Sequence, residues 1–125
     1  MLTQRAELAK QLPEHGWQVL VVEDCGLEWW ADEIWLIESL WSPGGFRLYL
    51  IFLVDPMADS ERAKGHNVWA VGTSTVRPVD RGTAEGQPLL SLGHGWRSHL
   101  AEFFAGLAGL RSQAGTGASP AGGEI

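Results

Sequence analysis

One carboxylate, Glu38, interrupts the apolar run from Trp35 to Trp41, and its position is the one most suggestive of chemistry. A buried carboxylate has a raised pKa unless a cation pairs with it, and perturbed carboxylates often mark functional sites. Arg47 would face Glu38 across a hairpin, and Tyr49 follows on the same strand face. Two alternatives stay open: Glu38 belongs to a site with Arg47 and Tyr49, or it occupies a solvent-facing or edge position, which we favour.

Other polar residues predict no catalytic or metal centre. The acidic residues near the first predicted turn could bind a cation or act as an acid–base pair, but we expect a solvated rim of mixed charge; they are Glu23, Asp24, Glu28, Asp32 and Glu33. The four histidines lack the spacing of a helical zinc pair. Cys25 has no basic neighbour in sequence, and no nucleophile motif is present. We assign no catalytic residue and no cofactor, and we lean toward a protein that is not an enzyme.

Among the residue types that could bind a partner, tryptophan is the one most clustered along the chain. The chain has seven, and four of them, Trp29, Trp30, Trp35 and Trp41, lie in one stretch. Tryptophan supplies a large apolar area and an N–H that must find a partner, and it is enriched among the residues that dominate interface energies. The candidate anchors for a partner are therefore Trp30, Trp35, Trp41 and Trp69.

Hydrophobic periodicity predicts the elements that would position these residues. Apolar spacing predicts helices over 2–12 and 96–111, the second with one strong apolar face. Alternating β-rich runs predict strands at 17–23, within 29–41, at 46–54 and at 68–76, and a short fifth strand at 89–92. Residues 55–67 and 77–88 are predicted to be polar loops. The turn at 42–45, Ser-Pro-Gly-Gly, predicts a hairpin.

This order predicts an α+β fold: an antiparallel meander sheet of four or five strands, with the N- and C-terminal helices packed on one face. Residues 1–111 would form one domain, and residues 112–125, rich in Gly, Ala and Ser, a disordered tail. The side of Phe46 to Val54 that begins with Phe46 is entirely apolar and should face the core. The opposite face of the sheet either contacts a partner or is covered by loops or by curling of the sheet.

Composition narrows the class of protein. A formal net charge of −6 disfavours nucleic acid and anionic membrane surfaces as partners. No apolar run approaches the roughly 18 residues that suggest a membrane span, and the first residues lack the apolar core of a signal peptide. A single cysteine permits no disulfide within the chain, so we expect a cytoplasmic protein.

The leading functional hypothesis is a non-enzymatic protein–protein interaction domain that uses an aromatic sheet face. It would be of the adaptor, immunity or chaperone-like class, and its partner would be another protein or a second copy in a homodimer. In element order alone the chain resembles secretion-chaperone-like folds. The alternative is a small-molecule-binding or enzymatic domain with a Trp-lined pocket between the sheet and the C-terminal helix, whose polar groups would come from Glu38, Arg47, Tyr49 or His99.

Overall fold

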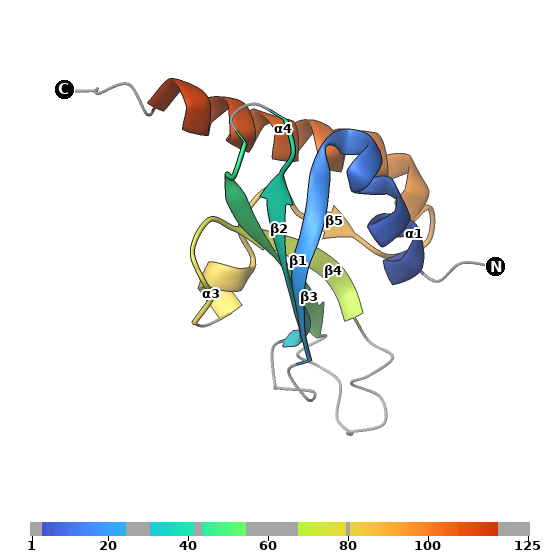
Figure 1. The fold of residues 1–125 in the computed structure, drawn as a ribbon. Helices are drawn as coiled ribbons and strands as arrows, with labels where there is room; N and C mark the ends of the chain where they lie inside the picture. Colours follow the sequence, from blue (N-terminus) through green and yellow to red (C-terminus); the bar gives the residue numbers. More distant parts are fainter. Residues whose placement is uncertain (1–3, 25–30, 42–43, 55–67, 80, 118–125) are drawn as a thin grey trace.

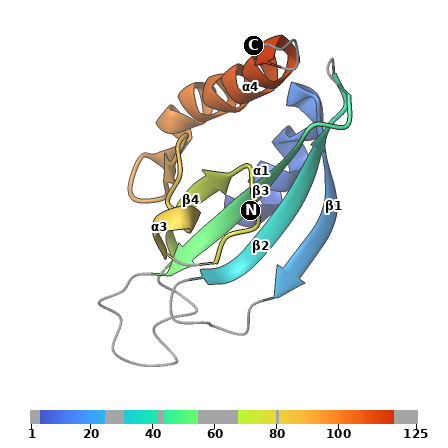
Figure 2. The ribbon, with the colours of Figure 1, turned by 90° about the vertical axis from the view of Figure 1, so that its left-hand side faces the viewer.

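The computed structural model describes residues 4–24, 31–41, 44–54, 68–79 and 81–117 of the 125-residue chain. It confirms the α+β fold: five antiparallel strands form one open sheet, with a helix from each end of the chain on the same face (Figures 1 and 2). The strands are β1 (Trp17–Asp24), β2 (Ala31–Ser39), β3 (Arg47–Val54), β4 (Val68–Ser74) and β5 (Leu90–Ser91). The helical segments are α1 (Gln4–Gln11), η1 (Pro13–His15), α3 (Arg81–Ala84), η2 (Trp96–His99) and α4 (Leu100–Gly117).

The sheet is a meander, because each strand pairs with the strands next to it in sequence. β2 pairs with β3 in the register Ile37↔Leu48 and Glu38↔Arg47, so the predicted hairpin is present. β1 contains a register irregularity against β2 between Val19 and Val21. An extra residue in one strand bends that strand and increases its twist, so the direction of β1 changes at this irregularity.

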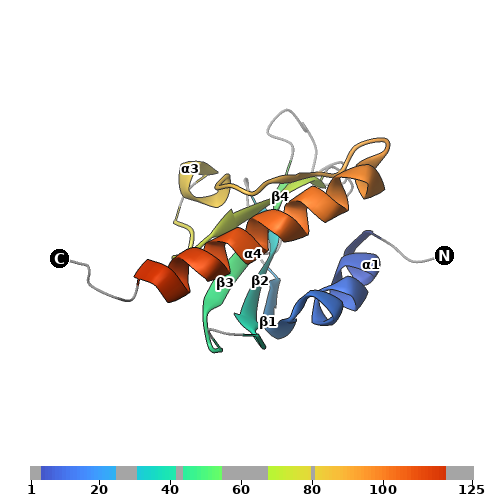
Figure 3. The ribbon, with the colours of Figure 1, turned by 90° about the horizontal axis from the view of Figure 1, so that it is seen from above.

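The main core lies between the sheet and the two terminal helices. As predicted, one side of β3 faces this core, through Leu48, Leu50 and Phe52, all at most 1% exposed. α4 crosses the strands obliquely, as Figure 3 shows from above, and packs Phe103, Phe104 and Leu107 against them among others. This core also contains Leu8, Leu12, Trp17, Trp35, Ile37, Val71, Leu90, Leu92, Trp96 and Leu100.

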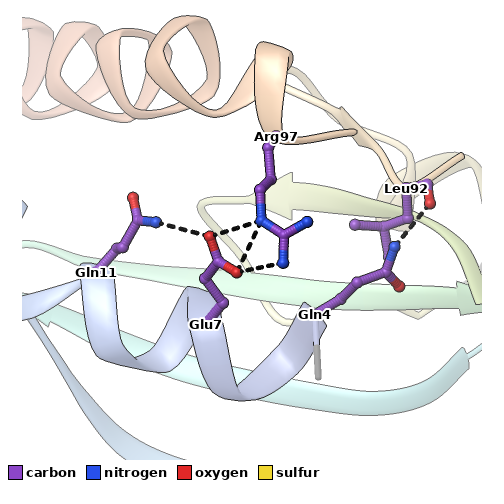
Figure 4. Close-up of polar contacts among 5 residues, drawn as sticks. All are labelled: Gln4, Glu7, Gln11, Leu92 and Arg97. Atoms are coloured by element: carbon purple, nitrogen blue, oxygen red, sulfur yellow. Dashed lines mark hydrogen bonds and ion pairs between the residues drawn. The ribbon is translucent and has the colours of Figure 1, made fainter. Parts of the chain in front are cut away.

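Polar contacts hold α1 against the chain that precedes α4 (Figure 4). Arg97 of η2 donates from Nε and Nη2 to the carboxylate of Glu7, with the Nη2–Oε1 distance at 2.8 Å. Gln11 donates to the same carboxylate, and Gln4 donates to the carbonyl oxygen of Leu92. Because Glu7 and Arg97 are 90 residues apart, this pair ties one end of the chain to the other.

The segment 81–89, most of which the sequence predicted to be a polar loop, begins with α3 on the opposite face of the sheet and reaches α4 at Pro88. The short helix α3 places Ala84 in a second buried cluster with Ile34, Ile51, Leu53 and Ala70 among others. Gly72 of β4 allows this close approach, because a Cβ there would lie 1.9 Å from the carbonyl oxygen of Ala84. The predicted alternative that a loop covers this face is therefore correct for the β3–β4 half of the sheet.

A buried arginine, Arg111, lies at the far end of the core and is 5% exposed. Its guanidinium lies 4.7 Å from the ring centroid of Trp17 and 4.9 Å from that of Trp41. Nη1 donates to the carbonyl oxygen of Gly16 at 3.1 Å and to Oγ of Ser39 at 3.3 Å. Burial lowers the pKa of Arg111 below its ordinary value. The residue thus joins α4 to the start of β1 and the end of β2.

The helix that contains Arg111 also continues farther than expected. α4 runs to Gly117, past residue 111, where the apolar pattern predicted the helix to end. The apolar stripe ends at Leu110, and the sequence does not indicate that the charged residue after it, Arg111, also packs inward. Residues 118–125 of the predicted tail lie outside the described residues.

Candidate interaction surface

The second half of β1 is an apolar edge strand exposed on both sides. Leu20, Val21 and Val22 are consecutive and are 39%, 52% and 54% exposed. Val21 pairs with Leu36 on the face opposite the helices, whereas Val22 pairs with Trp35 on the helix side. Within the described part of the chain, β1 has a strand neighbour on one side only, β2. An exposed apolar edge strand is a template for pairing with another chain.

Next to this edge the described residues leave the face over β1 and part of β2 uncovered, although Ile34 of β2 is buried, and a shallow slot of about 160 Å³ lies there. We call the β1–β2 part of this face, together with the slot, the open face. The slot is lined by Val21, Glu23, Ile34, Leu36, Tyr49 and Arg77. Arg77 reaches from the end of β4 to the carboxylate of Glu23 on β1, with Nη2 2.6 Å from Oε2. The open face therefore joins an apolar row, Val21–Leu36–Tyr49, to a charged pair at its border.

Glu38 and Arg47 are brought together on this same side of the sheet, as the hairpin register predicted. Nε of Arg47 lies 3.1 Å from Oε2 of Glu38, and Gln18 donates to the other carboxylate oxygen at 3.0 Å. The Arg47 side chain is 57% exposed. Glu38 is thus a paired carboxylate whose side chain is 21% exposed, so it is neither fully buried nor fully solvent-facing, and it lies in the row next to Leu36 and Tyr49.

The tryptophans proposed as anchors are not gathered on the open face. Trp35 is 5% exposed in the helix-side core, with its ring centroid 4.7 Å from that of Phe52. Trp69 is 39% exposed, lies where the register of β4 against β3 is irregular, and is not among the residues that line the slot. Trp41 is 53% exposed and contacts Arg111 beyond the end of β2. Trp30 lies outside the described residues.

A larger groove of about 470 Å³ lies between α4 and the segment that leads into β5. It occupies the region where the sequence placed a pocket in the alternative hypothesis, between the sheet and the C-terminal helix. No tryptophan is among the residues that line it, although His99 is. The lining comprises Gln87, Pro88, Leu89, Ser91, His99, Glu102, Phe103, Gly106, Gly109, Leu110 and Gln113.

Among the described residues, no group of three or more His, Cys, Asp or Glu side chains could hold a metal ion. Most of the acidic cluster at the first turn can still be located: Asp32 and Glu33 both pair with Arg5 of α1, and Glu23 pairs with Arg77. Cys25, Glu28 and the loop 55–67 lie outside the described residues. In the part of the chain that the structure covers, no helix is both long and apolar enough to cross a membrane.

The sequence did not single out β1 or Arg111. The run Val19 to Val22 was visible as apolar residues in a strand, but its exposure depends on which strand ends the sheet. Comparisons with known proteins add no relative: no family model matches the chain, and neither a curated protein nor a solved structure does. The candidate site therefore rests on the geometry alone.

Proposed function

We propose that this chain is a non-enzymatic protein-interaction domain that pairs through the edge strand β1, with the open face beside it. The observation that carries the proposal is the exposure of three consecutive apolar residues, Leu20 to Val22, on a strand that has a neighbour on one side within the described chain. Monomeric proteins usually blunt such edges with charge, proline, a bulge or a covering segment, and β1 still exposes three apolar residues at its own register irregularity. The single cysteine supports the cytoplasm as the proposed compartment.

The partner that this edge fits is a second copy of the chain. Antiparallel pairing of two β1 strands about Val21 brings Val21 and Val22 of each copy against the Leu20–Val22 stretch of the other. Glu23 and Asp24 of each copy then lie toward the start of the other copy's β1, beyond the register irregularity between Val19 and Val21, so no two acidic residues are opposed. Apolar cross-strand pairs stabilise a sheet, and like charges directly opposite destabilise it. The helices of both copies would then lie on one side of a continuous sheet, and both open faces on the other.

The test is sedimentation velocity of the purified chain over a concentration series that reaches the high micromolar range. Val21→Lys places a charge at the centre of the proposed pairing and leaves the main core intact. Val79→Lys is the matched control, because Val79 is 78% exposed and lies outside the sheet. We expect wild type and V79K to dimerise, and V21K to remain monomeric with an unchanged circular dichroism spectrum.

The dependence of dimerisation on salt concentration gives a second test of the proposal. Each copy has a formal net charge of −6, so the two copies repel one another at low ionic strength. Salt screens this repulsion, whereas backbone pairing and apolar contact are little affected. Dimerisation should therefore strengthen when salt is raised. A wild-type chain that stays monomeric throughout, or a V21K chain that dimerises as wild type does, would overturn the proposal.

A further inference from the structure

The groove between α4 and residues 87–91 is separate from β1 and from the open face. Its volume of about 470 Å³ falls within the roughly 300–1,000 Å³ typical of small-molecule sites. One wall is a single helical face formed by the end of η2 and by α4, on which His99, Glu102, Gly106 and Gly109 follow one another at helical spacing. The other wall is the extended segment from Gln87 to Ser91, which leads into and includes β5.

Two glycines of α4 shape this groove in different ways. A Cβ at Gly106 would lie 2.6 Å from Cβ of Pro88, so this glycine is needed for the two walls to meet. A Cβ at Gly109 would meet nothing within 4 Å. Glycine in a helix interior costs about 1 kcal/mol relative to alanine. Gly109 therefore carries a cost that packing does not explain, and its missing side chain leaves the groove wide.

The groove combines an apolar floor with an acidic rim. Phe103 is buried and Leu110 half-buried, and together with Pro88 they offer a ring or short chain an apolar surface. Glu102 is exposed at the rim, and neither a hydrogen bond nor an ion pair engages its side chain within the described part of the chain. Among the described residues that line the groove there is neither a lysine nor an arginine. This charge distribution favours a cation and disfavours an anion.

We propose that this groove binds a small amphipathic amine, with its apolar body against Phe103 and Leu110 and its ammonium group toward Glu102. The inference does not depend on pairing through β1. The apolar side chains hold the body of the ligand, and the carboxylate of Glu102 favours a positively charged ligand. Small-molecule sites usually combine an apolar lining with a few polar groups in this way.

The probes for this proposal are three compounds with the same phenyl group and different charges: phenethylamine, 2-phenylethanol and 3-phenylpropionate. Each is titrated into the ¹⁵N-labelled full chain, and amide shifts are followed by nuclear magnetic resonance. We expect saturable shifts that are confined to residues 87–91 and 99–113. The amine should bind most tightly and the carboxylate most weakly, because Glu102 attracts the first and repels the second.

Two variants test the space in the groove and the charge of Glu102 separately. Gly109→Leu fills the groove with a residue that favours helix, so we expect a fold at least as stable as wild type and loss of the shifts for all three probes. Glu102→Gln should weaken amine binding about threefold to fivefold, as for a partly exposed ion pair, and leave binding of the alcohol unchanged.

Three results would overturn the inference. The site is wrong if the wild-type chain shows no localised shifts with any probe, or if G109L binds the amine as wild type does. The ligand class is wrong if the carboxylate binds as well as the amine. The wild-type titrations decide both points without the variants, should G109L fail to fold.

Discussion

Replacing Arg111 gives the sharpest test of how the far end of the core is held together. Its guanidinium lies between the rings of Trp17 and Trp41, at 4.7 and 4.9 Å from their centroids. Within the described residues no carboxylate pairs with it, and its recorded hydrogen bonds go to carbonyl and hydroxyl oxygens. The two aromatic rings and these acceptors must therefore compensate for the loss of hydration.

The magnitude follows from these contacts. Two partly desolvated cation–π contacts contribute about 2 kcal/mol together. Charged hydrogen bonds to Gly16 and Ser39 contribute about 3 kcal/mol together. Burying the guanidinium costs several kcal/mol, taken here as about 3 kcal/mol. Arg111→Met keeps most of the apolar stem and removes the charge, so it should lower the free energy of unfolding by about 2 kcal/mol.

Arg111→Lys is the informative comparison. An ammonium group keeps the charge, but it is compact and strongly hydrated, and it cannot lie flat between two indole rings. We expect R111K to be at least as destabilising as R111M. Urea denaturation followed by circular dichroism gives the free energies, and tryptophan fluorescence, which sums all seven indoles, includes the two flanking rings. If R111K were milder than R111M, charge rather than stacking would be the dominant contribution. If R111M were more stable than wild type, desolvation would dominate and the compensation argued here would be wrong.

Two further predictions concern the contacts that close the fold. The hydrogen bonds from Arg97 lower the pKa of Glu7 below its ordinary value of 4.5, so this pair stabilises the fold above that value and is lost as the pH falls through the lowered pKa. Glu7→Gln should therefore reduce the melting temperature at pH 7, and the difference from wild type should vanish in acid; a difference that persists at low pH would contradict this. Gly72→Ala should lower the free energy of unfolding by about 2 kcal/mol because its Cβ would meet the Ala84 carbonyl. Gly93→Ala is its control, since a Cβ there meets nothing within 4 Å, and equal effects of the two changes would refute the close approach.

The strands could be predicted from the sequence because their pattern depends only on neighbouring residues. Along Phe46 to Val54 the side chains alternate between the two sides of the strand, so a run with one wholly apolar side predicts which residues face a core. The Ser-Pro-Gly-Gly turn then set β2 against β3, and this placed Glu38 opposite Arg47. The ion pair between them was therefore predictable before any fold was known.

The candidate interaction surface at β1 could not be predicted from the sequence in the same way. Val21 and Trp35 both lie in apolar strand runs, and nothing in their neighbours indicates that the first is 52% exposed and the second 5% exposed. The difference arises because β1 ends the sheet and β2 lies inside it beneath the helices. Hydrophobicity indicates that a side chain can be buried, but the neighbours that bury it come from distant parts of the chain.

The sequence by itself determined the order and type of the five strands and of the two terminal helices, the meander, and the α+β class, since these follow from periodicity and turn chemistry over a few residues. Tertiary structure alone decided which half of the sheet α3 covers, that Arg111 packs inward between two rings, and that a groove lies beside Gly109. These features depend on contacts between residues far apart in sequence, such as Gly72 with Ala84 and Gly106 with Pro88. Local patterns contain no information about which distant surfaces will meet.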